Sequence, residues 1–208
     1  PMGPIEGWPT SIKTTVALML RSPVPIVALF GPLGTMIYND SYSGFAGGRH
    51  PTLLGSAVRE GWPEVADFND TVMKVGLAGG TLSYRNQELT LHRSGRPEQV
   101  FMNLDYSPVI GEGGVPVGVI AIVVETTEQV KAIEQLRENE ERLRFLDALN
   151  RETARSMDAD EILQTTTRMV GEFLGVSNCA YADMDPDEDH FTIRGDWNLP
   201  PSPSIVGH

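Results

Sequence analysis

The chain of 208 residues has a single cysteine, Cys179, and no long apolar run. One cysteine can form neither an internal disulfide nor a cysteine-based zinc cluster, and such a composition suits a reducing cytoplasm. A membrane-spanning helix needs about 18 or more apolar residues in succession, and no such run occurs. We therefore expect a cytoplasmic protein with no membrane-spanning segment in this chain.

Basic residues are scarce relative to acidic ones, and the net charge is −12. Residues 1–124 hold 8 basic and 10 acidic residues, a net of −2, whereas residues 125–208 hold 8 and 18, a net of −10. Proteins that bind nucleic acids concentrate Lys and Arg to neutralise phosphates. The sequence has no such basic patch, so we expect no nucleic-acid partner.

The pattern of apolar residues predicts an α+β fold. Two short strands come first, then helical pieces broken by glycine and proline, and then three strands with alternating polarity. This order is typical of an antiparallel sheet with helices packed on it. The predicted elements are helices over 9–21 and 65–78 and strands over 26–30, 35–38, 81–93, 99–109 and 117–124.

The composition changes sharply after Glu125. Residues 128–157 contain no Pro or Gly, which predicts a helix about 45 Å long at 1.5 Å per residue. A heptad pattern places Leu136, Leu143, Asn150 and Met157 at one core position and Ala132, Asn139, Leu146 and Thr153 at the other. One interpretation is a solvated helix that packs on its own chain. We favour the other, a parallel homodimer through residues 128–157, with Leu136, Leu143, Leu146, Asn150 and Met157 in the seam.

The last part of the chain is predicted to hold one more helix and a hairpin. Asp158 has the character of an N-cap, and Gly175 ends the apolar stripe of this helix. Two strands then flank an acidic loop over 183–189, in which Glu188 stands where a calcium loop needs glycine. We therefore predict no metal site.

Several short motifs in the first 127 residues carry a family resemblance. They are Gly3-Pro4-Ile5-Glu6-Gly7-Trp8-Pro9, Tyr38-Asn39-Asp40-Ser41-Tyr42, Gly48-Arg49-His50-Pro51 with Leu54-Gly55, and Gly61-Trp62-Pro63-Glu64-Val65. They resemble a PAS subfamily found at the N-termini of bacterial sensor histidine kinases. The closing Glu125-Thr126-Thr127 is similar to the acidic-x-Thr motif that ends PAS domains, where the family has Asp more often. The segment from about Arg142 resembles the start of a GAF domain.

The resemblance implies a PAS-like five-stranded antiparallel sheet with flanking helices, a pocket between them, and a helix that passes the state of the domain to an effector. It implies an N-terminal extension over 1–22, a PAS sensor over 23–127, a linker helix over 128–157 and a partial GAF-like segment over 158–208. We expect the sensing and dimerisation region of a kinase in a two-component system, without a catalytic site of its own. The alternative is a sensor that binds flavin or another small ligand and controls a phosphatase or a cyclic-nucleotide enzyme.

The junction of the last strand with the long helix is the predicted signal relay. A carboxylate there, Glu125, can hold a donor of the domain and favour the N-terminus of the helix, and Thr126 or Thr127 can cap that helix. Rearranging these bonds would tilt or rotate the helix. Ordinary capping without switching is the alternative interpretation.

Pocket candidates are residues expected where sheet and helices meet, and a filled core is the interpretation that we favour. No cofactor is required. A cysteine adduct of the LOV type is excluded for residues 1–178, which contain no cysteine, and residues 65–79 lack the histidine that commonly binds haem in PAS domains. Cys179 lies in a short apolar strand, which argues against bilin attachment; a non-covalent flavin stays open. The candidates are Tyr38, Tyr42, Phe45, Trp62, Phe68, Tyr84, Phe101 and Asn103.

Overall fold

The computed structural model describes residues 2–184, 191–200 and 202–206, so most of the acidic loop lies outside the described residues. The chain divides into two compact units, Pro1–Ala132 and Ile133–His208. Among the described residues, no helix combines the length and the apolarity that crossing a membrane requires.

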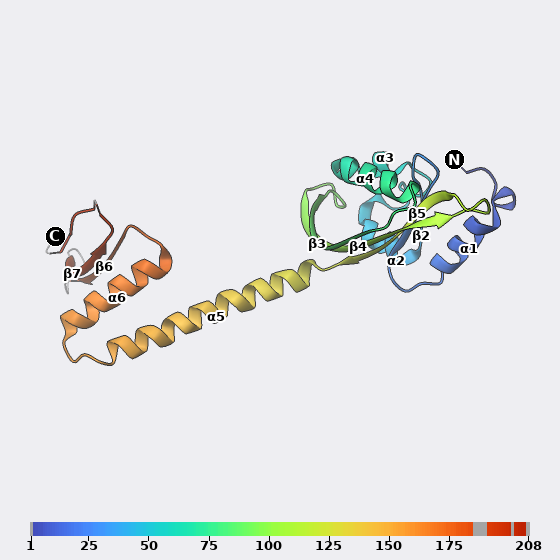
Figure 1. The fold of residues 1–208 in the computed structure, drawn as a ribbon. Helices are drawn as coiled ribbons and strands as arrows, with labels where there is room; N and C mark the ends of the chain where they lie inside the picture. Colours follow the sequence, from blue (N-terminus) through green and yellow to red (C-terminus); the bar gives the residue numbers. More distant parts are fainter. Residues whose placement is uncertain (1, 185–190, 201, 207–208) are drawn as a thin grey trace. The chain divides into compact units, whose positions relative to one another are not determined.

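The first unit is built on one antiparallel sheet of five strands in the order β2-β1-β5-β4-β3 (Figure 1). The sequence therefore predicted the fold class correctly: α+β, with a five-stranded antiparallel sheet and flanking helices. The strands are β1 (Ile26–Phe30), β2 (Thr35–Tyr38), β3 (Leu82–Leu91), β4 (Glu98–Ile110) and β5 (Pro116–Glu125). The helices are α1 (Thr10–Met19), α2 (Asp40–Ala46), α3 (Val58–Gly61) and α4 (Ala66–Leu77), with 3₁₀ turns at Ile5–Gly7, Gly47–Arg49 and Pro63–Val65.

Each face of the sheet has its own hydrophobic core. On β4 the buried residues alternate, and Val100, Met102, Leu104 and Tyr106 belong to the core that also contains residues of α2, α3 and α4. Helix α1 contributes to a second core, around Phe30 and Val109. Strand β1 contributes to both cores, and all five of its residues are buried.

One buried amide, Asn39, fastens the segments around β1. Its Oδ1 accepts hydrogen bonds from the amides of Ile26 (3.1 Å) and Tyr42 (2.9 Å). It therefore caps α2 and fixes the start of β1 at the same time. Its Nδ2 donates to the carbonyls of Met19, Ser22 and Val24.

Helix α5 (Thr127–Thr153) is shorter than the helix predicted over 128–157. It ends at Thr153, so Met157 lies beyond the helix and is fully exposed, and it does not extend the predicted seam. The physical reason is the next helix: the amide of Asp158 donates to the Ser156 hydroxyl (3.1 Å), and its carboxylate accepts from the Asp160 amide (2.9 Å). This local capping turns the chain before it re-enters a helix.

The second unit contains α6 (Ala159–Leu174) and an antiparallel ribbon of β6 (Asn178–Met184) and β7 (Phe191–Asn198). As predicted, Asp158 caps α6 and Gly175 ends it, in a left-handed conformation with φ 64°. The ribbon packs on the helix through Trp197, whose ring lies against Gly171. A Cβ atom at position 171 would lie 2.2 Å from this ring, so the contact requires glycine.

Candidate functional site

A single residue, Thr126, separates the end of β5 from the start of α5. Its amide still pairs with the sheet and donates to the Phe101 carbonyl (2.8 Å), while its own carbonyl accepts the first helical bond, from Val130 (2.9 Å). The side chains of Thr126 and Thr127 are buried. The sheet and the first turn of α5 are therefore joined through the backbone of this one residue.

Thr127 links the start of α5 to Phe101 of β4 and to Glu125 of β5. Its Oγ1 accepts from the Phe101 amide (3.0 Å) and donates to Oε1 of Glu125 (2.9 Å). The Thr126 hydroxyl donates to Oδ1 of Asn86 (2.9 Å). Asn86 lies at the irregular register of β3 and has φ 47°, a conformation that Asn tolerates better than most residues. The exit of the sheet, residues 125–127, where β5 passes into α5, is thus hydrogen-bonded to β3 as well as to β4.

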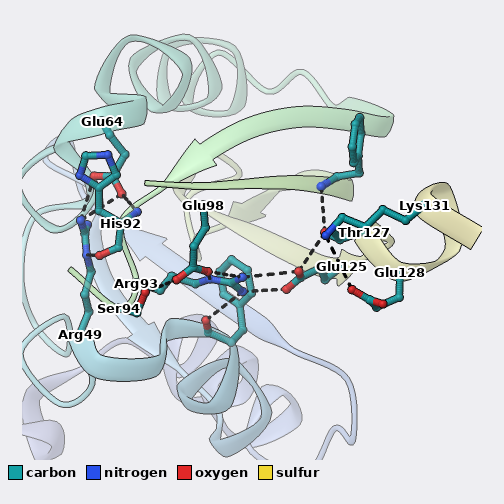
Figure 2. A network of polar contacts seen from close by, with 12 residues as sticks. Arg49, Glu64, His92, Arg93, Ser94, Glu98, Glu125, Thr127, Glu128 and Lys131 are labelled. Carbon is teal, nitrogen blue, oxygen red and sulfur yellow. Dashed lines mark hydrogen bonds and ion pairs between the residues drawn. The ribbon is translucent and has the colours of Figure 1, made fainter. Parts of the chain in front are cut away.

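Arg93, which lies just after the end of β3, pairs with the carboxylate of Glu125. Its guanidinium contacts Glu125 at 2.7 Å and Glu98 at 2.9 Å, and only 16% of its side chain is exposed. Figure 2 shows Arg93 between these two carboxylates, with Thr127 beside Glu125. Partial burial alone would raise the pKa of Glu125, but hydrogen bonds from Arg93 and Thr127 outweigh it and hold that pKa below its usual range. Glu125 therefore stays ionised at neutral pH.

Sequence reasoning placed Glu125, Thr126 and Thr127 at this junction but missed Arg93. The arginine lies 32 residues before its carboxylate partner. It reaches Glu125 only because β3, β4 and β5 pair in this register. A charged residue beside a turn gives no local signal of such a contact.

A small cavity lies between the sheet and helices α2 to α4, with a volume of about 50 Å³. Of the eight pocket candidates, Tyr42, Phe45, Trp62 and Phe68 line it. Tyr38 instead bonds to His50 Nδ1 (3.1 Å), and Tyr84 packs behind Phe68 with ring centroids 5.0 Å apart.

Phe101 and Asn103 do not line the cavity. They alternate along β4 with Met102 and Leu104, which do line it, so their side chains point to the opposite face of the sheet. The amide oxygen of Asn103 accepts from the Asn86 amide there (2.9 Å).

The cavity also has two polar residues that were not predicted, Asn69 and Tyr106. Each residue as a whole is more than nine-tenths buried. Within the part of the chain that the structure describes, neither side chain makes a hydrogen bond to another residue, and its polar atoms are not fully shielded, because no fully buried side-chain N or O atom there lacks a partner. Burial raises the pKa of Tyr106, so its hydroxyl stays protonated. Ligand pockets typically measure about 300–1,000 Å³. The cavity therefore has room for water molecules, and a flavin requires core side chains to move apart.

No protein-family model matches the chain, and no curated protein matches it. Solved structures do match. The PAS domain of BvgS from Bordetella pertussis has 22% identity and a TM-score of 0.47, over 62% of this chain and 96% of that one. A sensory box sensor histidine kinase from Vibrio cholerae has 17% identity and a TM-score of 0.39, over 55% and 87% of the two chains. The PAS domain of an HTR-like protein from Haloarcula marismortui has 18% identity and a TM-score of 0.40, over 55% and 91%.

Two of these three structures are named as PAS domains, and the third as a sensory box sensor histidine kinase. At such identities the likeness is one of fold alone.

Helix α5 presents two different faces. Leu136 and Leu143 are about two-thirds exposed, at 69% and 66%, and Leu146 is exposed at 42%. Phe145 lies about 200° around the helix from Leu143 and stacks on Phe173 of α6, with ring centroids 4.1 Å apart. Its neighbours Ala148 and Leu149 are half-buried. Helix α6 therefore covers the face of α5 that lies opposite to Leu136, Leu143 and Leu146.

The charged residues of α5 avoid the heptad core positions. Three of its ion pairs, Arg137–Glu141, Glu140–Arg144 and Asp147–Arg151, join residues four apart, all of them outside the predicted seam. Such pairs stabilise the helix in water and leave an uncharged stripe along it. The stripe consists of Ala132, Leu136, Asn139, Leu143, Leu146, Asn150 and Thr153.

Proposed function

We propose that this chain is the sensing and dimerisation region of a bacterial sensor histidine kinase. In this proposal residues 23–127 are a PAS sensor, α5 carries its state onward, and residues 158–208 begin a GAF-like segment before a cytoplasmic effector. The observation that supports the relay is the exit itself. Only Thr126 stands between the sheet and the helix, and the Arg93–Glu125–Thr127 contacts brace it.

The bracing network has the properties of a switchable joint. Arg93 is shared between Glu98 and Glu125, so a change in the β3–β4 hairpin alters its hold on the exit carboxylate. Glu125 in turn accepts from Thr127, the first residue of α5. When the contact with Arg93 is lost, the first helical turn can take another direction relative to the sheet.

A parallel homodimer is the second part of the proposal. The leucine stripe of α5 is exposed and uncharged, and α6 packs on the opposite face. A second copy of the same helix buries this stripe by knobs-into-holes packing, and Asn150 at a core position favours one register. A monomer in sedimentation experiments at high micromolar concentration would count against this assembly.

Cysteine cross-linking tests the orientation of the helices. In a Cys179→Ser background, Leu143→Cys places one thiol in the proposed seam, where a parallel dimer brings it next to its own copy. Glu141→Cys, about 200° around the same helical turn from Leu143 and with a native side chain that is 56% exposed, is the matched control. We expect oxidation to link the Leu143→Cys chains and to leave Glu141→Cys unlinked. Equal cross-linking of both variants would contradict the parallel seam.

A second candidate function is a ligand-bound sensor that controls a non-kinase effector. The observation that favours it is the pair of polar side chains, Asn69 and Tyr106, that line the cavity without a partner in the described chain. Mass spectrometry of the denatured protein identifies any molecule that copurifies. A sample with neither a copurified molecule nor visible absorbance removes the flavin form of this candidate.

A further inference from the structure

Two arginines stack on the aromatic wall of the cavity from its outer side. The Arg93 guanidinium carbon lies 5.2 Å from the centroid of the Phe45 ring, and that of Arg49 lies 4.6 Å from the Trp62 ring. The two rings are themselves 5.9 Å apart and both line the cavity. Each ring is therefore in contact with the cavity and with a cation.

The Arg49 stack is anchored within the helical layer and at the end of β3. Arg49 pairs with Glu64 (3.0 Å) and donates to the His92 carbonyl (3.3 Å). Glu64 accepts from the His92 amide (2.8 Å), so both backbone groups of His92 are held, as Figure 2 shows. These contacts fix the residue next to Arg93 and do not include a residue of the exit.

The Arg93 stack differs because its cation also pairs with Glu125. Arg93 further contacts the carbonyl of Phe45 at 3.5 Å. Phe45 thus connects a cavity wall to the guanidinium that braces α5, across elements that are far apart in the sequence. Phe68, which lines the same cavity, packs instead on Tyr84 and Tyr106.

We propose that Phe45 is a positioning residue that couples the cavity to the exit through Arg93. The coupling rests on the proposed relay function. A molecule that enters the cavity must displace the side chains around it, because about 50 Å³ leaves little free room. Displacement of the Phe45 ring weakens the stack that holds Arg93. The guanidinium then pairs less with Glu125 and more with Glu98.

Hydrogen exchange at the exit tests this coupling in the full chain. The reporters are the amides of Phe101, Thr126 and Val130, which make the bonds of the junction. Phe45→Leu removes the ring face and keeps an apolar side chain. We expect it to speed exchange at these amides about fivefold or more, as a partly buried cation–π contact implies. Phe68→Leu is the matched control. We expect it to leave the exchange of these amides unchanged after correction for the change in global stability, which a core amide of β1 reports.

Three further substitutions, Arg93→Gln, Phe45→Tyr and Glu125→Gln, separate the coupling from the relay. In an Arg93→Gln background, Phe45→Leu should have no additional effect at the exit, whereas Phe45→Tyr in the native background keeps the stack and native exchange. An effect of Phe45→Leu that equals that of Phe68→Leu, or that persists without Arg93, overturns the coupling. Glu125→Gln reports on the relay alone. If it loosens the exit while Phe45→Leu does not, the coupling fails and the relay stands; if it has no effect, the relay itself fails.

Discussion

Glu125→Gln removes the charge at the exit and keeps the length of the side chain. The carboxylate is 34% exposed and its partner Arg93 is 16% exposed, so the pair lies between a surface ion pair and a buried one. Surface pairs contribute about 0–1 kcal/mol, whereas breaking a buried pair costs about 3–5 kcal/mol. Because Arg93 keeps Glu98 as a second partner, we place the cost of this substitution at about 1–2 kcal/mol.

The lost stability should appear first as local opening at the start of α5, and less in the global free energy of unfolding. Arg93 and Thr127 each lose a charged acceptor, so the first turn of α5 should open more often while the core of the sheet stays closed. Hydrogen exchange at Thr126 and Val130 is the assay, and a loss of about 1.4 kcal/mol corresponds to tenfold faster exchange. A urea titration of the same variant measures the global change.

Glu128→Gln is the matched control for this experiment. It removes a carboxylate three residues further on, which is 93% exposed and, among the residues that the structure describes, pairs only with Lys131, at 4.0 Å. Both substitutions remove a negative charge near the N-terminus of α5, so they share any effect on the helix dipole. If Glu125→Gln loosens the exit no more than Glu128→Gln does, the Arg93 network does not brace the helix and the reasoning is refuted.

Three other changes have defined outcomes. Because the folded-state pKa of Glu125 is lowered, its contribution is present above the unfolded-state pKa and is lost as pH falls through the folded-state value. The protection factors of the exit amides, which are corrected for the intrinsic exchange rate at each pH, should therefore fall in acid, and less so in Glu125→Gln. Asn39→Ala leaves buried backbone groups without their partner and should lower the free energy of unfolding in urea by about 3 kcal/mol or more. A decrease below about 1 kcal/mol would contradict this role. Gly171→Val should displace Trp197, cost about 1–3 kcal/mol in the second unit and change its fluorescence, while an unchanged spectrum argues against the packing.

The sequence predicted the sheet well because its strands have clear polarity patterns. The alternation on β4 identified Val100, Met102, Leu104 and Tyr106 as one face, and these residues are buried together. The same alternation excluded Phe101 and Asn103 from that face. They were proposed for the pocket on residue type, which is a weaker guide than the pleat of a strand.

Contacts between distant residues could not be predicted in this way. Arg93 and Glu125 meet because β4 lies between β3 and β5, and nothing near either residue specifies the partner. The end of α5 was misplaced for a related reason. Helix propensity continues to Met157, but Ser156 and Asp158 use local side-chain bonds to start a new helix.

The most direct test of the central claim measures distances between the two copies of α5. A spin label at Glu134→Cys in a Cys179→Ser background lies on the first half of the helix, outside the proposed seam. We expect one short distance between the copies in the native chain and a shifted or second distance in Glu125→Gln. No measurable distance between copies, or the same distribution in both proteins, would contradict a dimeric helix that responds to the exit.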